Sequence, residues 1–290
     1  MAECIAKPSY DLRLLTRSSG RLHSSNCARI TTCDGDLLDT ASLRRFVTPG
    51  CTLVHLAYLT SGSAANLRAA ANLAKVAKER GVRRVVHCST AVVIGFSQRG
   101  IVTEDTPALP RGEYQATKLN IEQLLRADLH PAVELAILRP TEVIGPGGKN
   151  LQPMIERVRN RSSFGNGLRR FVLKSRQFNY VSVHNVVAAL LLLANTPATL
   201  TSDVYNISDD DDPDNNYGAV ETIIASLLER KTVRLIDPAL PKQWLSMLFR
   251  LLPEHAPPDR IYSHSRISAL GYRKVISLRA AIAEMVPGVR

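Results

Sequence analysis

The sequence predicts an α/β fold built on a doubly wound parallel sheet. In its first half, short apolar segments alternate with a long segment rich in Ala and Leu, and this is the pattern of buried parallel strands joined by helices. At 290 residues, the chain can hold one large α/β domain with a smaller appendage. We therefore expect a strand–helix–strand core with a ligand site at the carboxyl ends of its strands.

The predicted strands are short, apolar and partly β-branched, as buried parallel strands tend to be. They cover residues 12–15, 52–57, 82–88 and 133–138. Residues 63–80, between the second and third strands, are predicted to form a helix with Ser63 as N-cap and Gly81 as C-cap. Its apolar side chains recur at helical spacing and are expected to line one stripe. They are Leu67, Ala70, Ala74 and Ala77.

Beyond about Pro146 the regular alternation fades, which predicts a smaller, substrate-side lobe. We expect a core domain over residues 1–146, with residues 147–290 forming mainly a substrate-binding lobe that partly returns to the core. Within this lobe the patterns predict a helix over 186–195, a strand over 204–207 and a Pro-flanked helix near 242–252. The acidic run at 209–212 is predicted to be a turn.

The chain is basic, with 37 Lys and Arg against 26 Asp and Glu, a formal net charge of +11 and a pI of about 9.7. Part of the excess falls in one acid-free set: Arg157, Arg159, Arg161, Arg169, Arg170, Lys174 and Arg176. Such a set suits a phosphate-bearing ligand or an anionic surface, and a solvated basic loop is the alternative. No zinc-finger spacing or aromatic-basic RNA motif is present, so we do not expect a nucleic-acid partner.

The five cysteines are scattered without CxxC or His/Cys ligand spacing, so we expect no metal site and a reducing compartment. The N-terminus has no apolar signal core. The longest apolar run, 186–194, is too short to span a bilayer. These features predict a cytoplasmic protein without a transmembrane segment.

Tyr114 and Lys118 are the most informative pair in the chain. They lie four residues apart in a segment that reads as helix, so both side chains leave the same face. A phenol has a pKa of about 10, and a fixed ammonium nearby favours the phenolate. A Tyr tuned in this way can exchange a proton with an alcohol or carbonyl. Upstream, Ser89 and Thr90 follow a predicted strand and place hydroxyls at its carboxyl end.

Thr90, Tyr114 and Lys118, in this order, resemble the extended branch of the short-chain dehydrogenase/reductase superfamily. More specifically, the chain is similar to the NAD-dependent epimerase/dehydratase family, and it also has hydroxysteroid-dehydrogenase-like features. The resemblance covers nearly the whole chain. The motifs that carry it are 85–95, 138–146, Gly35-Asp36-Leu37, His55-Leu56-Ala57, Asn66 and 270–278.

The resemblance implies a Rossmann-like, NAD(P)-binding domain over 1–146 and hydride transfer between substrate and nicotinamide. Tyr114 would be the acid/base, and Lys118 would lower the pKa of Tyr114 and bond the nicotinamide ribose. Thr90 would orient the reacting substrate oxygen, with Asn66 completing the catalytic set. The cofactor-binding residues implied are Arg17, Asp36, Leu37, Ala57, Tyr114, Lys118 and Pro140. Arg17 stands where NAD-preferring relatives place an acid, so NADP is favoured.

One part of the family pattern is missing, because none of residues 1–11 is Gly and the expected G-x-x-G-x-x-G turn is absent. The chain is therefore expected to start inside the first helix of an N-terminally truncated fold, with Pro8 at that helix's end. A start codon placed too late or a truncated gene would explain this. A degenerate member that no longer binds cofactor normally is the alternative.

A nucleotide-sugar ranks first as substrate, with Arg176 facing its diphosphate. A sterol-like or other hydrophobic alcohol ranks second, because an apolar segment that includes Trp244 could line an apolar cleft. A third hypothesis is a cofactor-free binding protein on the same fold. The resemblance also implies a possible homodimer.

Overall fold

The computed structural model describes residues 11–17, 30–95, 100–160, 173, 175–230 and 259–286. The chain forms two compact units that interleave along the sequence. The first comprises residues 1–93, 110–138 and 189–205, and the second comprises residues 94–109, 139–188 and 206–290. The predicted linear division into 1–146 and 147–290 stays a prediction.

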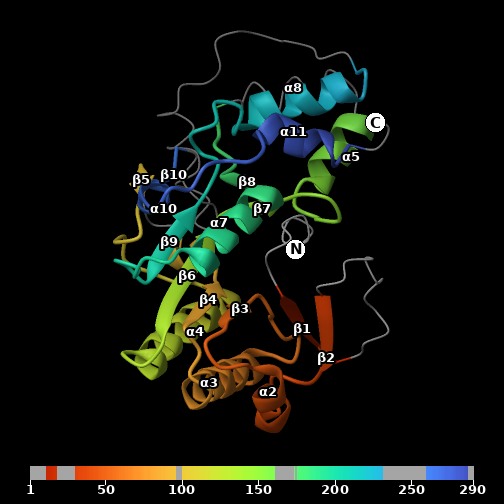
Figure 1. Cartoon of the computed structure of the whole chain (residues 1–290). Helices are drawn as coiled ribbons and strands as arrows, with labels where there is room; N and C mark the ends of the chain where they lie inside the picture. The colour runs from red at the N-terminus through yellow and green to blue at the C-terminus, as the bar shows by residue number, and fades with distance from the viewer. Residues whose placement is uncertain are drawn as a thin grey trace. The chain divides into compact units, whose positions relative to one another are not determined.

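A four-stranded sheet runs through the first unit in the order β3-β4-β6-β9 (Figure 1). Its strands are β3 (Thr52–His55), β4 (Arg84–Cys88), β6 (Glu134–Pro140) and β9 (Val204–Ile207). The β3–β4 and β4–β6 pairs are parallel, as predicted. The strand predicted over 204–207 is confirmed to the residue. β3 ends at His55, two residues before the predicted end, because the chain leaves the sheet there for a loop.

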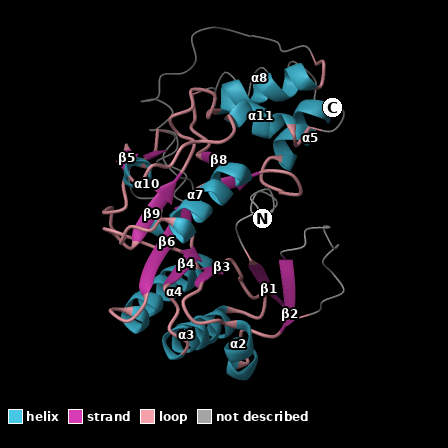
Figure 2. Ribbon diagram, viewed as in Figure 1, coloured by secondary structure: helices cyan, strands magenta, loops and turns pink. Residues whose placement is uncertain are grey.

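Two further strands form a parallel pair at the start of the chain, β1 (Leu12–Thr16) and β2 (Ile30–Asp34) (Figure 2). β1 was predicted, whereas β2, with the polar sequence Ile-Thr-Thr-Cys-Asp, was not. Within the described residues, β1 pairs with β2 and β3 pairs with β4, in separate sheets. Val54, on β3, is 45% exposed, so one face of this strand lacks full cover.

Helices α3 (Ser63–Glu79) and α4 (Glu113–Leu129) pack against each other beside the four-stranded sheet (Figure 1). The predicted apolar stripe of α3 is buried at Ala70, Ala74 and Ala77 and half-buried at Leu67. It joins one hydrophobic core with Leu53, Val85, Leu125, Leu135 and Ile137. Burial of these apolar side chains is the main force holding the two helices to the sheet.

The predicted caps of α3 were wrong by one residue at each end. The N-cap is Gly62, which makes no side-chain cap bond, and the Ser63 hydroxyl instead accepts a hydrogen bond from Thr117 Oγ1 at 2.8 Å. Ser63 therefore ties α3 to α4. The C-cap is Arg80, and Gly81 follows it with a φ of 62°, the left-handed conformation that commonly ends helices.

α2 (Thr40–Phe46) follows β2 and is capped by the Asp39 carboxylate, which accepts from the backbone N–H groups of Ala41 and Ser42. The remaining elements are short, and all but η2 and α7 lie mainly in the second unit. They are the 3-10 helix η2 (Ala91–Ile94), the strands β5 (Ile101–Val102), β7 (Glu142–Ile144), β8 (Tyr180–Ser182) and β10 (Ile261–Tyr262), and the helices α5 (Gln152–Asn160), α7 (Val183–Asn195), α8 (Tyr217–Leu227), α10 (Ser265–Ala269) and α11 (Leu278–Ala283). α5, α8 and α11 bury Ile155, Ile224 and Ile282 in a second core.

The acidic run at 209–212 does turn, but the prediction of a simple turn was incomplete. Asp209 and Asp210 are buried, at 1% and 7% exposure. Asp209 accepts from the Ser182 N–H, and Asp210 accepts from the Tyr262 N–H and from Asn179. Burial raises the pKa of Asp210 to about 7. The helix predicted near 242–252 lies outside the described residues, and no helix among the described residues is long and apolar enough to cross a membrane.

Candidate functional site

Helix α4 places Tyr114 and Lys118 one turn apart, as the sequence predicted. Tyr114 lies in the first turn and is 46% exposed, so its phenol can reach a ligand. Lys118 is 4% exposed, and its Nζ donates a hydrogen bond to the carbonyl oxygen of Cys88 at 3.1 Å. The ammonium is therefore fixed against the last residue of β4, while the phenol remains accessible.

Tyr58, in the loop after β3, is a member of this site that the sequence did not reveal. Its ring meets the Tyr114 ring edge-on, with centroids 5.1 Å apart and an interplanar angle of 70°. The Lys118 ammonium lies over the Tyr58 ring, 5.2 Å from its centroid. The only sequence signal was an aromatic directly after His55-Leu56-Ala57.

The pKa of Tyr114 shifts in the opposite direction to the one expected from the sequence. Burial, the Tyr58 phenol and the Cys88 thiol raise the pKa of Tyr114 above its ordinary value. The lowering by Lys118 that the resemblance implied is not found in this structure. Burial lowers the pKa of Lys118, while Cys88 and Glu122 act in the opposite direction. The phenol is therefore held in its protonated form at neutral pH, ready to donate.

Thr90 lies just beyond the carboxyl end of β4, two residues after the carbonyl that holds Lys118. It is 9% exposed, and its hydroxyl oxygen accepts a long hydrogen bond, 3.4 Å, from the Val92 N–H. The neighbouring Ser89 hydroxyl turns inward instead and donates to the buried Glu122 carboxylate at 2.5 Å. Of the two hydroxyls, Thr90 is the one without a buried acidic partner.

Asn66 is buried in α3, and its side chain holds the loop that carries Tyr58. Its Oδ1 accepts from the Leu59 N–H at 2.7 Å, and its Nδ2 donates to the carbonyl oxygens of Leu59 and Gly62, both at 2.8 Å. Both donor hydrogens of the amide are used on this loop. The geometry makes Asn66 an anchor of the loop.

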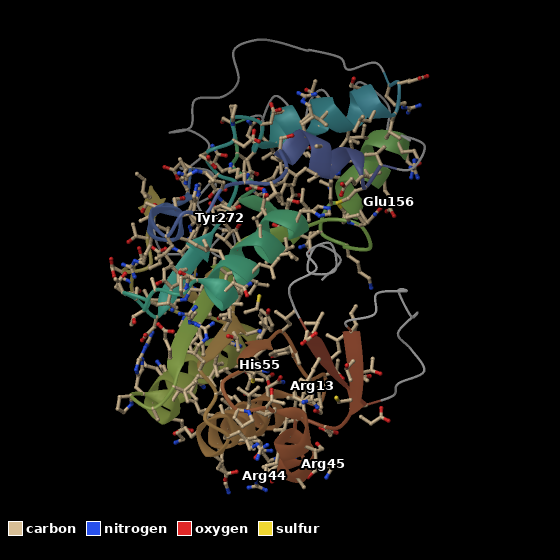
Figure 3. All side chains as sticks on the ribbon, viewed as in Figure 1. Arg13, Arg44, Arg45, His55, Glu156 and Tyr272 are labelled. Carbon is tan, nitrogen blue, oxygen red and sulfur yellow. The ribbon has the colours of Figure 1, made fainter. Side chains whose placement is uncertain are left out.

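Two buried histidines contact each other on the adjacent strands β3 and β4. His55 and His87 are register partners on β3 and β4, with Nδ1 atoms 3.0 Å apart and rings stacked at a centroid distance of 4.9 Å. Figure 3 labels His55 among the side chains of the first unit. Burial, with the Lys118 charge, lowers the pKa of His55 to about 4, and burial also lowers the pKa of His87. Both imidazoles are neutral at pH 7, so one Nδ1–H donates to the other Nδ1.

The predicted cofactor-binding residues Arg17, Asp36 and Leu37 lie at the ends of β1 and β2. The Gly35 N–H donates to the Thr16 carbonyl at 3.0 Å, which brings the turn Gly35-Asp36-Leu37 beside Arg17. A Cβ on Gly35 would lie 2.7 Å from Leu15 Cδ1 and 3.1 Å from Ser42 Cβ, so the turn is closely packed here. The Asp36 carboxylate accepts from the Leu38 N–H at 2.8 Å, and Arg17 is exposed.

The remaining predicted residues are placed as follows. Ala57 is exposed, immediately before Tyr58. Pro140 is buried at the end of β6 and belongs, like Arg176, to the second unit. Arg176 is half-buried, and its charge works against the burial that raises the pKa of Glu142. Arg161, Arg169, Arg170 and Lys174 lie outside the described residues.

The polar groups of the first unit fit the two nucleoside ends of a dinucleotide. The buried Lys118 ammonium and the accessible Tyr114 phenol suit the ribose hydroxyls of one nucleoside and a reacting substrate oxygen. The exposed Arg17 guanidinium and the turn that carries the Asp36 carboxylate suit the other nucleoside. Residues 1–10, where the missing Gly-rich turn was sought, are outside the described residues. Among those described, no group of three or more His, Cys, Asp or Glu could hold a metal.

Three comparisons place the chain among known proteins. The model of the NAD dependent epimerase/dehydratase family matches residues 1–208. Protein y4nL of Sinorhizobium fredii, itself uncharacterized, is 28% identical over 188 residues, 57% of this chain and 53% of that protein. UDP-glucose 4-epimerase of Bacillus subtilis is 35% identical over 108 residues, 32% of each chain. UDP-glucuronic acid 4-epimerase from Bacillus cereus, solved with NAD, has a TM-score of 0.72 at 16% identity, covering 98% of this chain and 90% of that one.

The matched parts span about half of y4nL and about a third of the B. subtilis epimerase. The structural likeness, at 16% identity, shows the α/β, Rossmann-like fold. The family model covers well over half of the chain, including Asn66, Thr90, Tyr114 and Lys118. The chain belongs to the NAD dependent epimerase/dehydratase family.

Proposed function

We propose that this chain is an NAD(P)-dependent enzyme that epimerises, dehydrates or oxidises a nucleotide-sugar at a secondary alcohol, with Tyr114 as acid/base. One observation carries the proposal: in a chain of this family, an accessible phenol stands one turn from an ammonium fixed to the end of a central strand. The Bacillus subtilis relative is a UDP-glucose 4-epimerase, and the Bacillus cereus structural neighbour is a UDP-glucuronic acid 4-epimerase.

Tyr114 performs the proton transfer in this proposal. Its raised pKa keeps the phenol protonated, so it can donate to a substrate carbonyl oxygen without help. In the opposite direction, the phenol must lose its proton before it can act as a base, and burial, the Tyr58 phenol and the Cys88 thiol oppose that loss. The bound nicotinamide supplies the chemistry of hydride transfer. Thr90 donates its hydroxyl hydrogen to the same substrate oxygen and holds it in place.

Arg176 is the proposed contact for the substrate diphosphate. A guanidinium presents several donors in a fixed plane that matches phosphate oxygens. Its partly buried setting strengthens such a contact over one made in bulk water. Loss of affinity for a UDP-sugar in Arg176→Met, without loss of cofactor binding, is the expected result.

Arg17 supports a preference for NADP, because an exposed guanidinium at the end of β1 matches a 2′-phosphate. The expected result is that Arg17→Asp raises the KM for NADP and lowers that for NAD. A cytoplasmic location and a homodimer complete the proposal. The scattered cysteines support the reducing compartment.

The experiment is incubation of the chain with UDP-glucose or UDP-glucuronic acid and either NAD or NADP, followed by anion-exchange separation of the sugar nucleotides. A new UDP-sugar, or reduced cofactor formed in step with substrate loss, is the expected result. No cofactor binding at millimolar concentration and no product with either substrate would overturn the proposal and favour a cofactor-free binding protein.

A further inference from the structure

Tyr58 contacts both proton-handling groups at once. Its ring packs edge-to-face with the Tyr114 ring at a centroid distance of 5.1 Å, and its face lies under the Lys118 ammonium at 5.2 Å. An edge-to-face pair of aromatic rings has a preferred geometry, and a cation is attracted to an aromatic face. One side chain thus constrains the direction of the phenol and the position of the ammonium.

The loop that carries Tyr58 is itself fixed. Asn66 uses its amide oxygen and both amide hydrogens on Leu59, which directly follows Tyr58, and on Gly62, the last residue of the loop. The Asn66 side chain is 3% exposed, so water competes little for these bonds. Tyr58, although 37% exposed, therefore stands on an anchored backbone. This gives the buried amide of α3 a physical connection to the phenol on α4.

We propose that Tyr58 is a positioning residue of the acid/base site, which orients Tyr114 and holds the Lys118 ammonium, and that Asn66 acts through it. The inference rests on the proposed function for its effect on turnover, but its effect on Lys118 needs no substrate. Nothing in the sequence apart from an aromatic after Ala57 pointed to this role.

Several titratable groups surround the Lys118 ammonium, so the contribution of Tyr58 must be separated from theirs. They are His55 on β3, Tyr58 in the loop after it, His87 and Cys88 on β4, and Tyr114 and Glu122 on α4. The histidines are neutral, the Cys88 thiol is half-buried with a raised pKa, and Glu122 is on the same helix. A substitution of Tyr58 leaves the other five groups in place.

The test uses two substitutions of Tyr58 in the full chain. Tyr58→Phe keeps the ring face and edge and removes only the hydroxyl. Tyr58→Leu keeps apolar bulk beside Lys118 and removes the ring. With [ε-13C]lysine labelling and the Lys118 signal assigned by its absence in Lys118→Met, NMR titration measures the protonation of Lys118 directly, without cofactor or substrate.

In Tyr58→Leu the ammonium loses its aromatic face, so the deprotonated fraction of Lys118 at a given alkaline pH should rise about threefold. In Tyr58→Phe it should match the unsubstituted chain. Where turnover is measurable, kcat/KM should fall about fivefold or more in Tyr58→Leu and be restored in Tyr58→Phe. Asn66→Ala should reproduce the Leu variant's Lys118 titration.

An unchanged or opposite Lys118 titration in a folded Tyr58→Leu would overturn the positioning role. A lower melting temperature alone would mean that the ring is only structural, and it would overturn the role in the same way. If Lys118 titrates as expected but no UDP-sugar is converted by the unsubstituted chain, then the proposed function fails and the role of Tyr58 stands.

Discussion

Lowering the pH should destabilise the first unit through the buried pair His55 and His87. His55 is 5% exposed and His87 is fully buried. A pKa that falls from 6.5 when unfolded to about 4 when folded corresponds to about 3 kcal/mol in the fully acidic limit. Between these pH values the unfolded imidazole binds more protons than the folded one. The contribution of His55 to the free energy of unfolding is therefore fully present above pH 6.5 and is lost as the pH falls towards 4.

At pH 5 the free energy of unfolding should be lower than at pH 7 by about 2 kcal/mol through His55 alone. Urea unfolding followed by circular dichroism at both pH values measures it. Asp210 acts in the opposite sense, because its raised pKa favours the folded state as the pH falls. We therefore compare the change in the free energy of unfolding between pH 7 and pH 5 in the unsubstituted chain with the same change in His55→Leu.

His55→Leu should be less stable at pH 7, because it leaves His87 Nδ1 without its partner. Its free energy of unfolding should, however, fall less between pH 7 and pH 5 than that of the unsubstituted chain, by about 2 kcal/mol. His264→Gln, which removes a partly exposed histidine of the second unit, is the matched control and should keep the full loss. An equal loss of unfolding free energy in the unsubstituted chain and in His55→Leu would show that His55 does not cause the pH dependence.

Two further predictions concern stability. Arg84→Met should lower the free energy of unfolding by about 3–5 kcal/mol, because the buried guanidinium pairs with Glu134 and donates to three backbone carbonyls. Arg44→Met, which breaks an exposed pair with Glu79, is its control and should leave the urea midpoint in place. Gly95→Ala should cost about 1–3 kcal/mol, since Gly95 has a φ of 74° and a Cβ there would lie 2.1 Å from the Leu109 carbonyl oxygen. A melting temperature unchanged by Gly95→Ala would contradict this backbone constraint.

The fold was largely predictable, because its main elements carry strong periodic signals. Apolar runs predicted β1, β4, β6 and β9, and Ala and Leu at helical spacing predicted α3. β2 escaped prediction because the polar side chains of Thr31, Thr32 and Asp34 are exposed, so its apolar signal is weak. The cap of α3 was misplaced because a hydroxyl next to a helix start can serve another helix, as Ser63 does.

The site was predictable in part. Spacing alone put Tyr114 and Lys118 on one helical face, and the strand end predicted the position of Thr90. Tyr58 was not predictable, because its role depends on where a loop folds back over α4. The His55–His87 pair depends on strand register, which sets two separated residues opposite each other. The pKa of Tyr114 was expected to fall, but burial and two neighbouring groups raise it.

The central claim is that Tyr114 handles the substrate proton, and kcat/KM for conversion of a UDP-sugar by Tyr114→Phe tests it most directly. Tyr272→Phe is the matched control, because it removes a phenol of the second unit whose hydroxyl has no hydrogen-bond partner within the described residues. We expect kcat/KM to fall about 10²–10⁴-fold in Tyr114→Phe and to stay unchanged in Tyr272→Phe. Turnover of Tyr114→Phe equal to that of the unsubstituted chain would contradict it.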